Sequence, residues 1–492
     1  MLGSFIFFML VFTLIGISSA RYSKNNKEDY YLASSSIKPW LVGLSAVATN
    51  NSGYMFIGVI GYTYVTGLAS IWLMMGWITG DFLASLFVHA RLKAAAERVG
   101  EVSYAGVLSQ WYGGKNDALQ RVIGAVSLLF LLAYASAQLV AGSKALNVLL
   151  GWPTWTGAGL GATLVTVYCY AGGIRASMWT DAAQSIVMIM AMGLLLVIAT
   201  ESLGGVSQAL IQLRAVDGFM NWFPKNLVIP GIAGSLLFAV SWMFAGLSVI
   251  GQPHVMVRFM TLADDSKMRH ARVWYYLWFL AFYLMATGVG LLSRVYLPDT
   301  GNFDAELALP MMAQHLMPPV LVGLMLAGIF AATMSTADSL VLSCSAAITH
   351  DLLPQQIEKT RLIKLTTVMI TVAALTWALL NRQTVFSLVI MSWSGLASAF
   401  APLLITQTLG GRPSQQSSII AVFVGLFVAL IWRYFGLQSA VYEGLPGILA
   451  GLVVINFASF KAKMIGTLSV RATSDDKQAK KTVILASDPK TE

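Results

Sequence analysis

The chain has 492 residues, of which 57% are hydrophobic and only 11% are charged, and its mean hydropathy is +0.71. This composition excludes a soluble domain, and apolar runs of about 20 residues, long enough to cross a bilayer as a helix, recur along the sequence. The net charge of +9 does not indicate nucleic-acid binding, because the basic residues lie between the apolar runs and membrane topology explains them. We therefore expect an all-α polytopic protein embedded in a lipid bilayer.

The apolar segments predict about thirteen membrane-spanning helices. The first, Leu2 to Ala20, is expected to be a membrane helix and not a signal peptide, because its basic residues follow the apolar run. The later spans are expected at 40–65, 69–90, 119–147, 155–172, 178–200, 228–252, 274–296, 319–345, 363–381, 384–408, 418–435 and 444–460.

The distribution of basic residues predicts the orientation. Most of the 31 Lys and Arg residues follow odd-numbered spans or lie in the tail, for example Arg91 and Lys93, or Arg258 and Lys267. Because cytoplasmic loops are enriched in Lys and Arg, we expect the N-terminus to lie outside the cell and the C-terminus in the cytoplasm. The expected location is the plasma (inner) membrane. The polar tail, 461–492, is expected to be disordered.

Chemical motifs exclude several function classes. There is no P-loop, no Gly-x-Ser-x-Gly and no His-Glu-x-x-His motif, and the five histidines are scattered. Cys169 and Cys344 lie in separate apolar segments and indicate no disulfide framework. We expect neither an enzyme nor an ATP-driven pump, and no organic cofactor.

The segment from Ala48 to Gly58 interrupts the second span with polar residues and glycine. Unsatisfied polar groups are costly in hydrocarbon, so such an interruption indicates an unwound helix whose carbonyl groups face a site, as in secondary transporters. The alternative is a kinked helix whose polar side chains only hold neighbouring helices together. A second interruption, Ser241 to His254, lies five spans later and favours the transporter; His254 itself is expected to be structural.

The ninth span carries a third polar group. Ser335, Asp338 and Ser339 share one helix face by their i, i+3, i+4 spacing. Hydroxyl and carbonyl oxygens with little formal charge suit a weakly held hard cation such as Na⁺. Asp338 is the strongest indication of function, because a carboxylate at that depth costs at least ~2.5 kcal/mol on insertion scales.

The sequence resembles the sodium/solute symporter family, most closely its sodium/proline branch. The resemblance rests on motifs in the family's order and spacing, which are Glu28-Asp29-Tyr30, Trp179-Thr180-Asp181, Gly251-Gln252-Pro253-His254, Met334-Ser335-Thr336 and Ile348-Thr349-His350-Asp351-Leu352. It implies a LeuT-type fold, in which a transport core (39–409) contains two inverted five-helix repeats, about 40–200 and 228–408. A first helix and cytoplasmic loop (1–38) precede this core, and two helices (410–460) follow it.

The resemblance also implies the ion sites. The main sodium site would use backbone and hydroxyl oxygens of Ala48, Asn51, Ala332, Ser335 and Thr336. A second cation position maps onto Asp181, Ser335, Asp338 and Ser339, with Asp338 in place of a usual hydroxyl residue. Two carboxylates close together in a low dielectric need a counter-charge, which a cation or a proton would provide.

The resemblance implies a substrate cavity that departs from the proline branch in three places. The branch has Asp where this chain has Asn50, and it has Trp and Tyr where this chain has Ala245 and Val249, so we expect a roomier cavity. Asp81, inside the third span, receives no role. The substrate-binding residues are expected to be Asn50, Ser52, Gly53, Tyr54, Gly58, Tyr134, Gln138, Ala245, Val249 and Trp393; for Gln138, a simple interhelical hydrogen bond is equally open.

We therefore expect a sodium-coupled symporter that imports a small organic solute, amino-acid-like (proline or related), by alternating access. One alternative is a proton-coupled symporter of the same fold that uses Asp338 and Asp181. Another is a transporter-like sensor, for which the tail is too short to hold a signalling domain. The sequence leaves the identity of the solute and the oligomeric state open.

Overall fold

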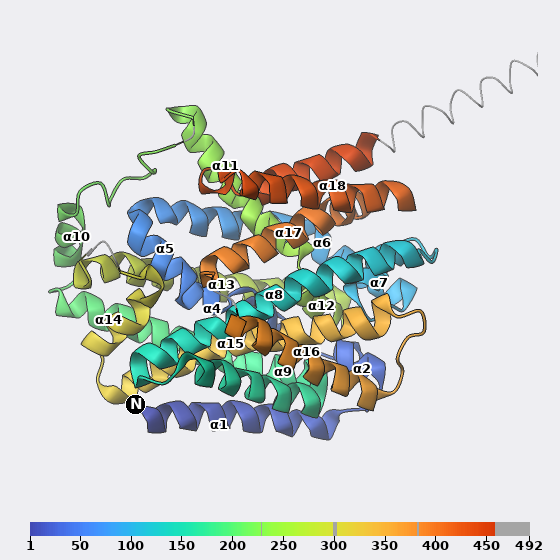
Figure 1. The fold of residues 1–492 in the computed structure, drawn as a ribbon, viewed down its shortest axis with the longest axis horizontal. Coiled ribbons are helices and arrows are strands. Elements are labelled where there is room, and N and C mark those ends of the chain that lie inside the picture. Colours follow the sequence, from blue (N-terminus) through green and yellow to red (C-terminus); the bar gives the residue numbers. More distant parts are fainter. Residues whose placement is uncertain (228, 299–302, 381–382, 458–492) are drawn as a thin grey trace, which may run out of the picture.

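The computed structural model describes residues 1–227, 229–298, 303–380 and 383–457. The expected tail, 461–492, lies outside the described residues. The helices run side by side across the picture in Figure 1. In chain order they are α1 (Leu2–Ser18), α2 (Lys27–Leu32), α3 (Pro39–Asn50), α4 (Gly53–Phe56), α5 (Gly58–Thr66), α6 (Ile71–Val99), α7 (Tyr104–Gln110), α8 (Asp117–Leu150), α9 (Thr154–Ser202), α10 (Val206–Ala215), α11 (Ile232–Leu247), α12 (Pro253–Met260), α13 (Met268–Tyr296), α14 (Ala308–Leu316), α15 (Pro319–Ala346), α16 (Thr360–Leu380), α17 (Val385–Thr408) and α18 (Gln415–Tyr434), followed by a short apolar helix, Gly444–Phe457.

Within the described ranges, ten helical segments are long and apolar enough to cross a membrane. Two of them, Gly53–Val99 and Thr154–Ser202, contain 47 and 49 residues, about twice the ~20 that one crossing needs. The second contains a break at Gly173, whose φ of 56° and ψ of −139° are not helical. The helical membrane fold is thus confirmed, while the number of about thirteen spans and the division into two repeats stay predictions.

The break at Gly173 has a local cause. A Cβ atom there would lie 2.5 Å from the carbonyl oxygen of Tyr30, so α2 can pack this closely only against a glycine. The positive φ is also one that glycine adopts without strain. Beside the break, Arg175 donates a 2.6 Å hydrogen bond to Asp29, which joins α9 to α2.

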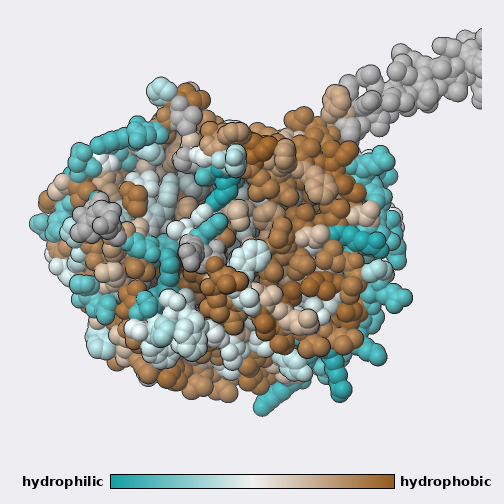
Figure 2. Space-filling view, in the orientation of Figure 1, coloured by the Kyte–Doolittle hydropathy of each residue, from teal (hydrophilic) through white to brown (hydrophobic). Residues whose placement is uncertain are grey.

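The helices differ in how deeply they are buried. In α15 and α17, 89% of the most apolar stretch is inside the protein, against 28–33% in α1, α16 and α18. α15 packs against α9, α8 and α1, so it is the central helix of the bundle. Figure 2 shows a broad apolar area right of centre and along the lower part of the molecule, with hydrophilic side chains along the left and right edges and a smaller group left of centre. This is the surface that a bilayer-spanning bundle presents.

The two ends of the bundle carry different short elements. The N-terminus, α10 and α14 lie at one end, and α2 and α7 lie at the other (Figure 1). We call these the α14 end and the α2 end. In the predicted topology the α14 end faces outward.

Candidate cation and substrate sites

The predicted interruption of the second span is present as a break between α3 and α4. α3 stops at Asn50, Asn51 leaves the helical region with φ −92° and ψ 72°, and α4 starts at Gly53. The Ser52 side chain caps the new helix by accepting a 3.1 Å hydrogen bond from the backbone N–H of Tyr54. The break is fully buried, so its freed backbone groups face the protein interior and not lipid.

Gly53 brings the broken segment into contact with two other helices. Its backbone N–H donates a 2.9 Å hydrogen bond to Oε1 of Gln138 in α8. A Cβ atom at this position would lie 2.4 Å from Cγ2 of Thr333 in α15. Gln138 therefore faces the broken segment, and the absence of a side chain at Gly53 allows the close approach to α15.

Four of the five expected sodium ligands lie together between α3 and α15. The Ser335 hydroxyl is 3.0 Å from the carbonyl oxygen of Ala48 and 3.4 Å from that of Ala332. The Thr336 hydroxyl donates a 3.0 Å hydrogen bond to the next carbonyl oxygen of α3, that of Thr49. Both hydroxyl groups are buried, so their contacts connect the break in α3 to the centre of α15.

Asn51, the fifth expected ligand, is the C-cap residue of α3 and donates its side-chain amide to the carbonyl oxygen of Val47 at 3.0 Å. The set of five therefore offers neutral oxygen atoms and no formal charge. Among the described residues no group of three or more His, Cys, Asp or Glu could hold a metal ion. Neutral oxygens of this kind suit a weakly held monovalent cation, whereas divalent and transition metals recruit carboxylates, imidazoles or thiolates.

The second expected cation position contains an arginine. Nη2 of Arg258, in α12, lies 3.2 Å from Oδ2 of Asp181 in α9 and 3.7 Å from Oδ1 of Asp338 in α15. It also donates hydrogen bonds to the hydroxyl oxygens of Ser177 (2.6 Å) and Ser339. The side chains of both aspartates and of the arginine are at most 1% exposed. Both carboxylates thus lie beside the same guanidinium, which supplies a positive charge from the protein itself, and the assignment of this position to a second cation stays a prediction.

The charges of this cluster do not cancel completely. Two carboxylates face one guanidinium, and each carboxylate accepts a hydroxyl hydrogen bond, from Ser45 to Asp181 at 2.6 Å and from Ser177 to Asp338 at 2.7 Å. One oxygen of each, Oδ1 of Asp181 and Oδ2 of Asp338, has no hydrogen-bond partner within the described part of the chain. An isolated buried charge is costly, and the guanidinium of Arg258 offsets part of that cost for both aspartates.

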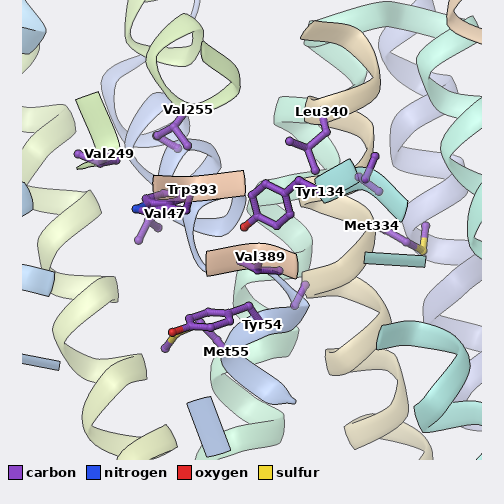
Figure 3. Close-up of a cluster of buried hydrophobic side chains, with 14 of the residues drawn as sticks. Val47, Tyr54, Met55, Tyr134, Val249, Val255, Met334, Leu340, Val389 and Trp393 are labelled. Atoms are coloured by element: carbon purple, nitrogen blue, oxygen red, sulfur yellow. The ribbon is translucent and has the colours of Figure 1, made fainter. Parts of the chain in front are cut away.

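Several expected substrate-binding residues surround Trp393 of α17. Its indole Nε1–H donates a 3.0 Å hydrogen bond to the carbonyl oxygen of Ala245, and the ring lies between Val249 and Tyr134 in Figure 3. Tyr134 in turn donates a 3.1 Å hydrogen bond to the Ser52 hydroxyl at the break. The space beside the two small residues, where we expected a roomier cavity, therefore holds the indole ring in this conformation.

Aromatic rings continue from Trp393 toward the α14 end. Trp77 lies 5.3 Å from Trp393 and 5.8 Å from Tyr54, measured between ring centroids, and Phe386 lies 5.4 Å from Tyr54. At Gly58 a Cβ atom would approach Cδ2 of Tyr54 to 2.8 Å, so this glycine makes room for the ring. These aromatic residues contact one another beside the break and are called the aromatic layer.

The Asn50 side chain contacts α6 and α13. Its side-chain amide donates to the hydroxyl oxygen of Tyr275 (2.5 Å) and to Oδ2 of Asp81 (3.4 Å). Asp81 also accepts hydrogen bonds from the hydroxyls of Tyr275 (2.6 Å) and Tyr276 (3.0 Å). The aspartate to which the sequence assigned no role therefore connects α6, α13 and the end of α3.

The family model of the sodium:solute symporter family matches residues 30–425 of this chain. The chain belongs to the sodium:solute symporter family. Two relatives have similar length. The high-affinity proline transporter PutP of Bacillus subtilis (strain 168) is 29% identical over 445 residues, which cover 88% of this chain and 93% of PutP. The sodium/proline symporter of Escherichia coli (strain K12) is 29% identical over 482 residues, which cover 94% and 93% of the two chains.

Two solved structures share the fold of this family member. A Na⁺-coupled sialic acid symporter in a substrate-bound outward-open state aligns with a TM-score of 0.77 at 17% identity, covering 93% of this chain and 96% of that one. Mhp1, a nucleobase-cation-symport-1 family transporter in a closed conformation, aligns with a TM-score of 0.58 at 14% identity, covering 88% and 95%. At these identities the likeness concerns the fold alone.

Membership of the sodium:solute symporter family confirms three expectations. The protein is a multi-pass membrane transporter with a LeuT-type fold, it is not an enzyme, and it couples solute symport to Na⁺. Arg258 is the member of the buried charge cluster that sequence reasoning missed, because it was counted among the basic residues of a cytoplasmic connection. A signal was present, since Arg258 is a lone charge within the apolar run from Val255 to Met260.

Proposed function

We propose that this symporter carries one sodium ion inward together with a small zwitterionic solute of the amino-acid class. The observation that carries the proposal is the contact between the broken helix and α15, where the Ser335 hydroxyl lies 3.0 Å from the Ala48 carbonyl oxygen. The five residues proposed to supply uncharged oxygen ligands to the ion are Ala48, Asn51, Ala332, Ser335 and Thr336. Rotation of the two hydroxyl groups turns their oxygen lone pairs toward an ion, so the site exchanges hydrogen bonds for sodium contacts.

The proposed stoichiometry of one sodium ion per solute follows from the contacts at the second expected cation position. Asp181, Asp338 and Ser339 all contact Arg258, whose guanidinium occupies the place of a second exchangeable cation. A membrane potential of 100 mV contributes about 2.3 kcal/mol per charge moved. One sodium ion can therefore accumulate a zwitterion about 50-fold from the potential alone, since 1.4 kcal/mol corresponds to a factor of ten.

The proposed solute class rests on the relatives and on the aromatic surroundings of the break. Both relatives named above are proline transporters, and Tyr54 and Tyr134 are the aromatic residues expected from that branch. Ala245 and Val249 replace larger rings, so movement of Trp393 would open more volume than a proline site needs. We propose a range of amino acids wider than proline alone.

The proposed direction is from the α14 end to the α2 end across the plasma membrane. On the α2 side a small cavity of about 30 Å³ is lined by residues that include Tyr31, Tyr104, Arg258 and Ser339. Release toward the cytoplasm would use this route, while the aromatic layer at Tyr54 closes the other side. Alternating access would exchange these two closures.

Sodium-dependent thermal stabilisation tests the ion site without knowledge of the solute. Because an ion that binds only the folded state stabilises it by RT ln(1 + [Na⁺]/Kd), saturating sodium should raise the Tm of the purified wild type above its value in potassium. The double variant Ser335→Ala/Thr336→Ala should lose this rise. A matched control is Ser293→Ala/Thr371→Ala, which removes two buried hydroxyls whose hydrogen bonds, among the described residues, are to their own helices.

Uptake into proteoliposomes then tests coupling. With radiolabelled L-proline as first probe and other amino acids as competitors, the sodium concentration for half-maximal uptake should rise at least tenfold in the Ser335→Ala/Thr336→Ala variant. The control pair should behave as wild type. Equal sodium stabilisation and equal sodium activation in both double variants would show that the ion binds elsewhere.

A further inference from the structure

A groove on the outer surface of the bundle lies between α6 and α13. Its volume is about 410 Å³, roughly fourteen times the ~30 Å³ that a water molecule takes up in the liquid. α6 contributes Phe82 and Leu86 to its lining, and α13 contributes Val273, Leu277 and Leu280. These five side chains are 44–63% exposed. Because their spacing places each set on one face of its helix, they form an apolar trough that is open to the surroundings of the protein.

Two arginines line one end of this groove. Arg269 and Arg272 lie at the start of α13. The segment that leads into α13 pairs with the backbone of Ile37, close to α2, through hydrogen bonds of 3.1 Å from Ile37 to Thr261 and from Ala263 to Ile37. The arginines therefore lie at the α2 end, and the apolar part of the groove runs from there toward the middle of the bundle.

Neither arginine has an acidic partner in the described part of the chain. Asp264, in the loop before α13, pairs instead with Lys267 at 3.4 Å. Arg272 donates one hydrogen bond, of 3.2 Å, to the carbonyl oxygen of Ser85 in α6, which leaves other N–H donors of its guanidinium available. Two guanidinium groups without a counter-charge attract an anion, and their planar geometry matches that of a phosphate group.

The wall of the groove is held in place from inside the bundle. The ring of Tyr276 lines the groove and contacts the ring of Phe82 edge-on, with 5.2 Å between centroids. Its hydroxyl donates a 3.0 Å hydrogen bond to Oδ1 of Asp81, which is fully buried. The bond from Arg272 to Ser85 fixes the charged end in the same way. The groove therefore exists before a ligand enters it, which lowers the entropy cost of binding.

The length of the groove matches one leaflet of a bilayer. From Arg269 to Leu280 the helix rises about 16 Å, at ~1.5 Å per residue, which is close to half of the ~30 Å hydrocarbon core. The two positive charges lie at the end where this leaflet would meet water, and apolar side chains follow toward the bilayer centre. A phospholipid has the same order of groups, whereas a free anion would leave the trough uncovered.

We propose that this groove binds one anionic phospholipid of the leaflet on the α2 side, with its phosphate group on Arg269 and Arg272 and an acyl chain along Phe82 and Leu277. The phosphate oxygens would accept charge-assisted hydrogen bonds from the two guanidinium groups. Any lipid would cover the apolar side chains, so the preference for a negative one comes from the arginines. In the predicted topology the α2 end faces the cytoplasm, where basic pockets between membrane helices recruit anionic head groups.

The lipid site is separate from the proposed function. None of the residues that line the groove is among those expected to bind the cation or the solute. Lipid binding should therefore be equal in sodium and in potassium. Failure of the proposed sodium site would leave it unchanged, and its own failure would leave the sodium site unchanged.

Native mass spectrometry of the purified full chain, titrated in detergent with dioleoylphosphatidylglycerol or dioleoylphosphatidylcholine, tests the charge preference. Wild type should bind one phosphatidylglycerol at least tenfold more tightly than phosphatidylcholine. Arg269→Gln/Arg272→Gln should weaken phosphatidylglycerol binding at least tenfold. The control Arg121→Gln/Arg361→Gln removes two exposed arginines at the starts of α8 and α16, outside the groove, and should bind this lipid as wild type does.

Filling the groove tests where the lipid lies. Leu277→Trp places a larger side chain in the trough and should weaken phosphatidylglycerol binding at least tenfold. Leu284→Trp, at a half-exposed position of the same helix outside the groove, should leave it unchanged. The soluble compound sn-glycerol 3-phosphate carries a phosphate group without acyl chains, so it should not compete with the lipid at equal concentration.

Four results would overturn the proposal. Wild type could bind the two lipids equally, or phosphatidylglycerol binding could survive either Arg269→Gln/Arg272→Gln or Leu277→Trp. Competition by sn-glycerol 3-phosphate would show that the arginines bind a free anion and not a lipid. A dimer that Leu277→Trp dissociates would show that a second copy of the chain covers the groove.

Discussion

Replacement of Arg258 by glutamine tests the charge cluster between α9, α12 and α15. The change leaves Asp181 and Asp338 buried without the guanidinium that lies 3.2 and 3.7 Å from them. Asparagine at position 338 in the same chain removes one of the two carboxylates. The single variant therefore leaves both carboxylates without this counter-charge, and the double variant Arg258→Gln/Asp338→Asn removes one of the two carboxylates.

The distances set the size of the expected effect. With an effective dielectric constant of about 20, attractions at 3.2 and 3.7 Å amount to about 5 and about 4.5 kcal/mol before desolvation is subtracted. The hydration that the arginine loses on burial offsets part of this attraction. The net cost of removing one partner from a buried ion pair is therefore about 3–5 kcal/mol. For a chain of 492 residues, whose unfolding entropy is about 1 kcal/mol per kelvin, this corresponds to a Tm lower by about 3–5 °C.

Thermal unfolding of the purified variants in sodium and in potassium is the assay. Arg258→Gln should have the lowest Tm in potassium, and sodium should raise it more than it raises that of wild type, since the two carboxylates then attract a second ion. The double variant should recover at least half of the loss. If Arg258→Gln unfolds at the wild-type temperature, or if removal of Asp338 recovers nothing, the arginine does not balance these aspartates.

Two further predictions concern the broken helix and the α2 end. Gly53→Ala should reduce uptake at least tenfold, because the added Cβ would lie 2.4 Å from Cγ2 of Thr333. The control is Gly159→Ala, where the added Cβ meets no atom within 4 Å, and its Tm should equal that of wild type or be slightly higher. Burial alone raises the pKa of Asp29, but hydrogen bonds from the Lys24 backbone and from Arg175 hold that pKa below its usual value. The ionised carboxylate therefore stabilises the fold above about pH 4, and this stabilisation is lost as the pH falls further. Asp29→Asn should therefore lower the Tm at pH 7, by up to about 3–5 °C from loss of a buried pair, and the difference from wild type should shrink in melts near pH 3.5.

The sequence alone determined the properties that depend on local composition. Apolar runs of about 20 residues identify membrane helices, because each residue's transfer energy adds along the segment whatever its neighbours in space are. The polar interruption from Ala48 to Gly58 was visible for the same reason, and the structure has the break between Asn50 and Gly53 within it. The order of motifs was sufficient to identify the family.

The tertiary structure decided which polar groups meet. The approach of Arg258 to both Asp181 and Asp338 depends on how three helices pack, and no property of the separate segments specifies it. The same holds for Asp81, whose partners come from α3 and α13, and for Trp393, which fills the space beside Ala245. Hydropathy is a sum over a local window, whereas the pairing of charges and rings depends on distances between segments far apart in the chain. A lone arginine beside the membrane boundary therefore has the same local pattern whether it faces water or lies beside two aspartates inside the bundle.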